Sequence, residues 1–457
     1  MSFVTSAGFA RPTVFAAALL LLCGAPTGGA QAQVVPDLPT VEGPITGPGP
    51  MHPGIRPGPE GTNLADFDYF DEEYFVPGFT VDPANPTSGV RTPYKTRLLI
   101  RKPANPQKFS GMLVGEPTHR GGNGLICQYA RFGIGQRGHA CMTVAARRIN
   151  LINPLTAGAG LYEFNIERYG NLQVTDAQAN QIIAQVGRLL RENPVGGPMG
   201  EYAVRTLILS GTSDSSGATR TYMSSGPMLD HSELRMPDGG PIYQGFLVTA
   251  ILGSGFVPTI ADAPVIQMPT QSELHSTNGF RRPDSDAPSN RFRSYEMSGM
   301  SHNDARENPA FFDCINMNLS QFPYGAMTFM GLQHLLDWAA HGTIPPRAPS
   351  VMEIDNNTSD GTRVALDEFG NAKGGIRTTY LDVPLFTITI PNSGPGLCSQ
   401  TGFQTRLPDD VLKRLYGNYG QYVSKVEHRL KELMDEGWFP KEYASDYVQK
   451  DLKAYKE

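Results

Sequence analysis

The segment from residue 207 to residue 223, LILSGTSDSSGATRTYM, constrains the fold more than any other part of the chain. An apolar, strand-like run passes into a helix-compatible run through a turn made almost entirely of small residues. Ser213 lies in this turn, which is the setting of a nucleophile elbow, where a sharp strand-to-helix turn exposes a serine hydroxyl at the edge of a sheet. The segment therefore makes hydrolysis the leading hypothesis.

The elbow departs in one position from the usual pattern G-x-S-x-G. Gly211 stands two residues before Ser213, but Ser215 replaces the closing glycine, which gives G-x-S-x-S. A second register would make Ser215 the nucleophile. We favour Ser213 because Gly211 then has its expected place.

In the rest of the chain, short apolar runs alternate with segments whose apolar residues have helical spacing. Such alternation predicts an α/β fold with a mostly parallel sheet and helices on both faces. The predicted strands lie within residues 96–104, 110–118, 139–147, 207–211, 245–252, 263–270 and 292–299, and the predicted helices within residues 176–193 and 324–342. After Cys398, residues 405–457 form a charged tail with apolar residues at helical spacing, which predicts surface helices packed on the main domain.

A serine needs a general base, and the base needs an acid that fixes its tautomer. In a hydrolase of this architecture both follow the serine along the chain, in the order acid and then histidine. His302 lies in a small-residue loop directly after a predicted strand, and Glu273 is the first carboxylate after the strand within residues 263–270. These two residues are the expected base and acid.

Other histidines and carboxylates fit less well. The other histidines after Ser213 lie next to the elbow, in the helix, in the tail or in an unassigned loop: His231, His275, His334, His341 and His428. Asp262 precedes its strand, at the wrong end of a parallel sheet, and Asp284 and Asp286 lie in a polar insertion.

An oxyanion hole needs N–H groups aimed at the developing negative charge. One is expected from the backbone of Asp214, and another from the loop Thr118–Gly124, THRGGNG, where we assign it to His119. An ionised Asp214 beside an oxyanion is unfavourable unless its side chain is paired or points away. We therefore expect Asp214→Asn to preserve or raise activity.

The N-terminus predicts export. Residues 1–32 combine Arg11, an apolar run and the small-residue site Ala30-Gln31-Ala32, which is typical of a secretory signal peptide cleaved before Gln33. Residues 33–65 are rich in Pro and Gly and are expected to run extended, and residues 66–457 are expected to form the main domain. The mature chain is thus expected in the periplasm or the medium, without a membrane span.

Four cysteines remain after cleavage, in a compartment that permits disulfides: Cys127, Cys141, Cys314 and Cys398. Four cysteines allow three pairings, and the sequence leaves all three open, although Cys127 and Cys141 are close enough to pair. The net charge of −6 and the lack of a basic run argue against a nucleic-acid partner.

Together these residues resemble the α/β-hydrolase superfamily, and within it a bacterial family of exported alpha/beta hydrolase domain proteins. That family typically has an elbow like G-x-S-Q-S-G and a histidine in a segment like YEVAGTAH, and the counterparts here are GTSDSS and YEMSGMSH, which ends at His302. LLDWAAHGTIPP and GNYGQYVSKVEHRLKELMDEGWFPKEYA are also similar to its later segments. The similarity covers residues 66–457 and implies an α/β-hydrolase fold. Asp214 and Ser216 depart from the family pattern, which bears on the geometry of the elbow.

The resulting hypothesis is an exported serine hydrolase that cleaves small or polymeric carboxylic esters with Ser213, His302 and Glu273. No metal or organic cofactor is implied, and the substrate and the oligomeric state stay open. An amidase or peptidase of the same fold is one alternative, and a non-catalytic binding protein on this scaffold is another.

Overall fold

A computed structural model describes residues 37–82, 84–85, 87–156, 158–225, 232–251, 257–260, 262–274, 281–307, 313–355 and 364–456. The predicted signal peptide lies outside these residues, as do His231 and His275. Between residues 37 and 63 the Pro- and Gly-rich segment forms one isolated bridge, Glu42 to Phe75, and no strand or helix.

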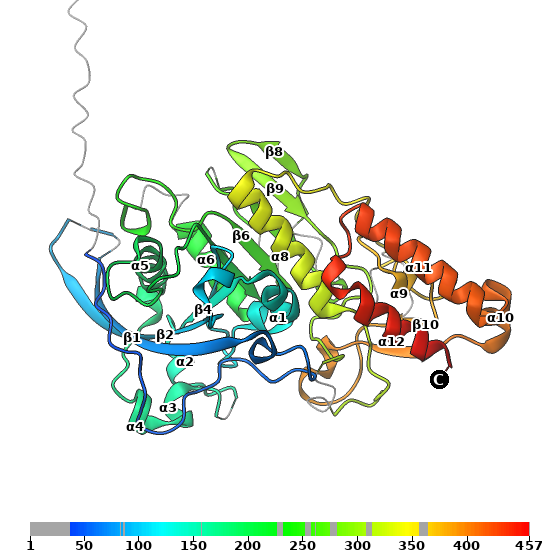
Figure 1. The fold of residues 1–457 in the computed structure, drawn as a ribbon, viewed down its shortest axis with the longest axis horizontal. Helices are drawn as coiled ribbons and strands as arrows, with labels where there is room; N and C mark the ends of the chain where they lie inside the picture. Colours follow the sequence, from blue (N-terminus) through cyan, green and yellow to red (C-terminus); the bar gives the residue numbers. More distant parts are fainter. Residues whose placement is uncertain are drawn as a thin grey trace, which may run out of the picture. The chain divides into compact units, whose positions relative to one another are not determined.

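One large sheet organises the described chain (Figure 1). Its strand order is β1-β2-β4-β3-β5-β6-β7-β9-β8. The strands are β1 (Tyr69–Val81), β2 (Arg91–Pro103), β3 (Met112–Pro117), β4 (Ala140–Val144), β5 (Thr206–Thr212), β6 (Phe246–Thr249), β7 (Val265–Met268), β8 (Ser285–Ala287) and β9 (Asn290–Ser294). The strands from β4 to β9 pair in parallel, while β1, β2 and β8 pair antiparallel at the two edges. The expectation of a mostly parallel sheet is confirmed.

Alternate residues of the central strands enter two separate hydrophobic cores, one on each face of the sheet. In β5, Leu207 and Leu209 belong to the core that contains Ile182 of α5, whereas Ile208 belongs to the core that contains Ile126 of α1. Strands buried on both faces are the reason why the central strands appear as continuous apolar runs in the sequence. The helices expected on both faces are therefore confirmed.

The longer helices are α1 (Leu125–Arg137), α5 (Ala179–Glu192), α6 (Asp214–Ser225), α8 (Tyr324–His341), α10 (Asp409–Tyr416), α11 (Tyr419–Asp435) and α12 (Ala444–Lys456). The short ones are α2 (Arg148–Leu151), α3 (Leu161–Phe164), α4 (Ile166–Tyr169), α7 (Gln271–Leu274) and α9 (Thr379–Asp382). Helices α1 and α8 lie side by side over one face (Figure 1). None of the helices within the described ranges is long and apolar enough to cross a membrane.

The C-terminal region is helical, as expected, and contains α10, α11 and α12, orange to red in Figure 1. Leu430 and Leu433 of α11 join the core under α1 and α8, so this region packs on the main domain. A separate two-stranded sheet, β10 (Phe386–Thr389) with β11 (Phe403–Arg406), precedes it.

Two disulfides resolve the pairing that the sequence left open. Cys127 of α1 is bonded to Cys141 of β4, and Cys314 is bonded to Cys398. The second bond joins positions that are 84 residues apart, on the loop that follows His302 and the short turn Gly396–Gln400.

Candidate active site

The turn between β5 and α6 has the geometry of an elbow. Ser213 has a φ of +56°, a left-handed conformation that residues other than glycine seldom adopt. Its N–H donates to the carbonyl oxygen of Thr249 on β6 at 3.2 Å, which holds the turn against the neighbouring strand. A Cβ at Gly211 would lie 2.5 Å from the backbone carbonyl of Ser215, so glycine is required there. Strain of this kind is maintained only where the surroundings fix it.

The structure brings the three expected residues into contact. His302 Nδ1 lies 2.6 Å from Oε1 of Glu273, and His302 Nε2 lies 2.8 Å from Oγ of Ser213. Because a carboxylate can only accept, Nδ1 carries the imidazole proton and Nε2 is left to accept from the serine hydroxyl. Glu273 is 1% exposed and His302 is 4% exposed, so water is largely kept from this chain of hydrogen bonds.

Local contacts hold the acid and the base in place. Glu273 lies in the one-turn helix α7 directly after β7, where its Oε2 accepts from the N–H of Thr270 at 2.6 Å. The backbone of His302 is fixed at both ends: its N–H donates to Oγ of Ser272 at 2.9 Å, and its carbonyl accepts from the hydroxyl of Tyr324 at 3.0 Å. Rigid attachment of this kind keeps the imidazole at the correct angle to Ser213.

Ser215, the alternative nucleophile, lies in a different environment. Its hydroxyl is fully buried, donates to Oε1 of Glu116 at 2.7 Å and also lies 2.8 Å from the carbonyl of Thr212. The N–H of Thr212 donates back to Oγ of Ser215 at 3.0 Å. Ser215 therefore stabilises the elbow through these hydrogen bonds. They also explain how a serine is accommodated where the usual pattern has a glycine.

Glu116, which sequence reasoning missed, supports the elbow at the end of β3. Its Oε2 accepts from the N–H of Ile126 in the first turn of α1 at 2.9 Å. Burial raises the pKa of Glu116 to about 8, although the hydrogen bonds from Ser215 and the α1 backbone oppose that rise. The signal in the sequence was a lone carboxylate in an apolar strand, which does not identify its partner.

The remaining histidines and carboxylates make other contacts. His334 is buried against Tyr295 and Trp438, His341 is exposed at the end of α8, and His428 is paired with Glu432 on the surface. Among the alternative acids, Asp262 is paired with Arg235, and Asp284 and Asp286 with Arg293. The structure brings none of these side chains to Ser213.

The carboxylate of Asp214 is paired. Arg147 donates to both of its oxygens, at 2.5 Å and 3.2 Å, and the N–H of Arg120 donates to Oδ2 at 2.8 Å. Burial by itself would raise the pKa of Asp214, but the hydrogen bonds and charge of Arg147 outweigh it and hold that pKa below its ordinary value. Asp214 is thus ionised beside Ser213 with its charge compensated. Sequence reasoning missed Arg147, which is 67 positions away.

The contribution expected from the backbone of His119 is not available. The N–H of His119 donates to the carbonyl of Asn123 at 2.9 Å within the loop, so in this structure it is not aimed at an oxyanion. The ring of His119, however, lines a cavity together with Ser213 and His302. Its Nδ1 accepts from the N–H of Gly121 at 2.9 Å, and burial lowers the pKa of His119 to about 4. The ring is therefore neutral, with its proton on Nε2.

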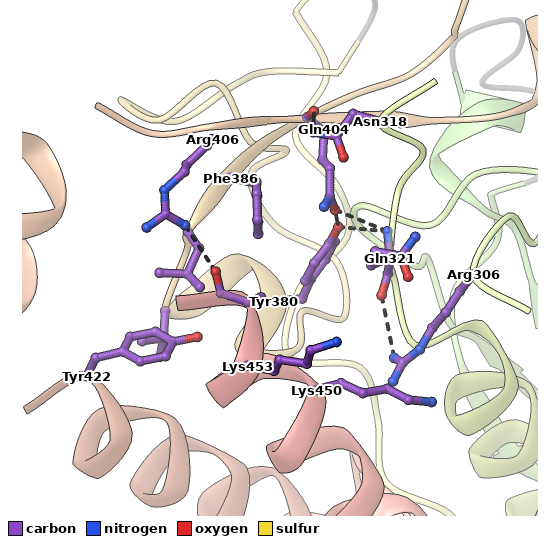
Figure 2. A pocket seen from close by; sticks show the side chains of 13 residues that line it. Arg306, Asn318, Gln321, Tyr380, Phe386, Gln404, Arg406, Tyr422, Lys450 and Lys453 are labelled. Atoms are coloured by element: carbon purple, nitrogen blue, oxygen red, sulfur yellow. Dashed lines mark hydrogen bonds between the residues drawn. The ribbon is translucent and has the colours of Figure 1, made fainter. Parts of the chain in front are cut away.

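Ser213 lies where two cavities meet. The smaller has a volume of about 140 Å³ and also contains His302, and the larger has a volume of about 610 Å³ and also contains Asp214. A further cavity of about 570 Å³ lies between β10, β11 and α12 (Figure 2). Its described lining has four cationic side chains and no serine, histidine or carboxylate, so it lacks the groups for this chemistry. Within the described ranges, no group of three or more histidine, cysteine or acidic side chains could hold a metal ion.

Two solved structures are similar to this chain at low sequence identity. A ferulic acid esterase from Streptomyces cinnamoneus has 12% identity, with 63% of this chain and 95% of that chain covered and a TM-score of 0.35. A putative dienelactone hydrolase from Klebsiella pneumoniae has 13% identity, with 58% and 99% covered and a TM-score of 0.31. A search of curated proteins found no match. The model of the family described as "Alpha/beta hydrolase domain" matches residues 41–449, and the chain therefore belongs to that family.

Proposed function

We propose that the protein is an exported serine hydrolase that cleaves carboxylic esters through an acyl-enzyme intermediate. The observation that carries the proposal is the continuous line of hydrogen bonds from Glu273 through His302 to Ser213, at 2.6 Å and 2.8 Å. Reactive serines are recognised by this geometry and by the roles of the three groups, independently of their spacing in the chain.

In the proposed reaction the Ser213 hydroxyl attacks the ester carbonyl carbon while Nε2 of His302 takes its proton. The tetrahedral intermediate collapses, the carbon–oxygen bond to the alcohol breaks, and the alcohol leaves with the proton from His302. Water then attacks the acyl-enzyme with His302 again as the base, which releases the carboxylic acid and restores Ser213. Glu273 accepts from Nδ1–H throughout and stabilises the imidazolium.

Two donors are proposed for the oxyanion. The backbone N–H of Asp214 belongs to the first turn of α6, where N–H groups have no acceptor within the helix. The second donor is the Nε2–H of the His119 ring, which replaces the backbone group expected from the sequence. A neutral imidazole donates without placing a permanent charge beside Asp214.

Labelling with a fluorophosphonate tests the nucleophile. We expect one adduct per chain on Ser213, no adduct on Ser213→Ala, and normal labelling of Ser224→Ala, which removes an exposed serine of the same helix α6 and is the control. An adduct on Ser215 would contradict the proposed register. A folded protein without any adduct would favour the alternative of a non-catalytic binding protein.

Matched substrates test the reaction type. We expect an aryl ester to be cleaved much faster than the amide of the same acid, with both activities lost in Ser213→Ala. Faster cleavage of the amide would favour the amidase or peptidase alternative. Export is tested separately, because a secreted mature chain should begin at Gln33 when its N-terminus is sequenced.

A further inference from the structure

The larger of the two cavities at Ser213 combines apolar and charged side chains. Its volume of about 610 Å³ lies within the roughly 300–1,000 Å³ that is common for small-molecule sites. Its lining includes three isoleucines, Ile149, Ile183 and Ile251, and five charged side chains. Such sites orient a ligand through a few polar groups on an apolar surface. The charges that the protein itself leaves uncompensated therefore indicate what this cavity can bind.

Two of the five charges cancel, and a third faces solvent. Arg147 donates to both oxygens of the Asp214 carboxylate, at 2.5 Å and 3.2 Å. Asp176 is exposed, and its Oδ1 accepts from the backbone N–H of Arg148 at 3.0 Å. Dissolved ions screen an exposed carboxylate of this kind. The remaining two charges of the lining are both positive.

These two charges belong to Arg120 and Arg220. Arg120 donates to Asp214 through its backbone N–H, while its guanidinium forms no ion pair or hydrogen bond with any residue that the structure describes. The same holds for the guanidinium of Arg220, whose Nη1 is enclosed by protein without a hydrogen-bond partner in the described chain. Both side chains are half-buried and line the cavity. The cavity thus has an excess of positive charge beside Ser213.

One edge of the Arg220 guanidinium is available to a ligand. The enclosed Nη1 cannot be reached, but Nε and Nη2 are not enclosed in this way, and neither has a partner among the described residues. The N–H groups of Nε and Nη2 are parallel, which is the geometry that binds both oxygens of a carboxylate. Arg220 therefore offers a bidentate site to an anion in the cavity.

Helix α6 provides an open path from Ser213 to Arg220. Arg220 comes seven residues after Ser213, which corresponds to a rise of about 10 Å at 1.5 Å per residue. Gly217 and Ala218 line the cavity between them, and a Cβ added to Gly217 would have no neighbour within 4 Å. Side chains on a helix lean toward its N-terminus, which is the end next to Ser213. An anionic group joined to the ester by a spacer of about four carbons would therefore reach the guanidinium.

We infer that the larger cavity binds a carboxylate of the substrate through Arg220 and Arg120, with the apolar spacer against the isoleucines of the lining. The inference rests on the proposed function and makes both arginines specificity-determining residues. When Asp176 is counted against the two arginines, one positive charge remains, and a single carboxylate matches it. The substrate class is therefore an ester in which the acid or the alcohol carries a second, free carboxyl group.

Two substrate pairs test the inference, because the members of each pair differ only in a terminal carboxylate or its neutral primary amide. The first pair is mono-4-nitrophenyl adipate and 4-nitrophenyl 5-carbamoylpentanoate, with the terminal group in the acid. The second pair is 4-carboxybutyl butanoate and 4-carbamoylbutyl butanoate, with the terminal group in the alcohol. We expect kcat/KM at low salt to be at least tenfold higher for the carboxylate member of one pair, which corresponds to about 1.4 kcal/mol. This ratio should shrink in high salt, which screens the charges.

Substitutions assign the preference to the two arginines. Arg220→Met keeps the apolar stem but removes the charge, so the carboxylate-to-amide ratio should fall at least threefold, and Arg120→Met should also lower it. Arg220→Lys keeps the charge without the parallel N–H groups and should keep part of the ratio. Arg220→Glu should bring the ratio below one. Arg414→Met, which removes an exposed arginine of α10 outside the cavity, is the matched control and should keep the ratio of the wild type.

The outcomes separate the two proposals. Equal kcat/KM within both pairs, or a ratio that neither Arg120→Met nor Arg220→Met lowers, would overturn the inference and leave the esterase proposal standing. A chain that takes the fluorophosphonate adduct but cleaves neither pair would overturn the inference as well, because it rejects the substrate class. If the folded chain cleaves neither pair and takes no adduct, the proposed function fails and the inference fails with it.

Discussion

The buried carboxyl group of Glu116 should make the stability of the protein depend on pH in an unusual direction. It lies under the elbow, where Ser215 and the N–H of Ile126 donate to it. Glu116→Gln removes the titrating proton and keeps the size of the side chain. The amide oxygen can still accept from Ile126, and the amide NH₂ can donate to Oγ of Ser215, whose own hydrogen then goes to the carbonyl of Thr212.

The magnitude follows from the pKa. Burial raises the pKa of Glu116 from the ordinary 4.5 to about 8. Because the folded pKa is above the unfolded one, the folded state holds the proton more tightly, and this stabilisation is present below pH 4.5 and lost as the pH rises through 8. Each pH unit between the two values is worth about 1.36 kcal/mol, which gives about 5 kcal/mol over the whole interval.

Urea unfolding at pH 5, 7 and 9 measures the effect. We expect the free energy of unfolding of Glu116→Gln, taken relative to the wild type, to rise by several kcal/mol between pH 5 and pH 9. Glu427→Gln, at an exposed position of α11, is the control and should follow the wild type at every pH. Parallel profiles for Glu116→Gln and the wild type would refute the reasoning, because they would mean that Glu116 is ionised in the folded protein at neutral pH.

Three further predictions concern the reaction. Glu273→Gln should lower kcat for ester hydrolysis by about 10³–10⁴-fold, because an amide can donate to Nδ1 and favour the wrong tautomer of the base; a loss below tenfold would contradict that role. His119→Phe should lower kcat by about 10²–10³-fold with little change in KM, while His119→Gln, which keeps a donor, should recover part of it; a change confined to KM would argue against an oxyanion donor. Arg147→Met should lower kcat/KM about tenfold by leaving the Asp214 charge unpaired beside the oxyanion, and adding Asp214→Asn should restore it; independent, additive losses would show that the pair does not act through charge.

The parts of the fold that the sequence predicted are those where local pattern and burial coincide. The strands β5, β6 and β7 are buried on both faces, so they appear as apolar runs, and α5 has an amphipathic spacing. Strand β1 was missed because it contains Pro77 and Gly78 and a buried Glu73. That carboxylate is paired with two arginines from distant segments, a compensation that no local pattern reveals.

The candidate site was likewise predicted in part from local sequence features. Ser213, Glu273 and His302 each follow a predicted strand, and the carboxyl ends of parallel strands meet at one edge of a sheet, so their positions in the chain were informative. The loop from Thr118 to Gly124 was identified by its glycines, but the N–H of His119 donates within the loop and the N–H of Arg120 donates to Asp214. The reassignment of the proposed oxyanion donor from the backbone of His119 to its ring depends on those hydrogen bonds, which cannot be read from the composition of the loop.

The disulfide between Cys314 and Cys398 makes the shape of the small cavity depend on the redox conditions in which the chain folds. Leu397 and Gln400, on either side of Cys398, form part of that cavity's wall, and the N–H of Asn303 donates to the carbonyl of Gln400 at 3.0 Å. The three reacting side chains are held by other contacts. It follows that a chain produced in a reducing cytosol would keep Ser213, His302 and Glu273 in contact. It would lose the covalent bond that fixes the wall of the cavity at Leu397 and Gln400. The choice of expression host would then change which substrates the cavity accepts, while the ability to cleave an ester would be retained.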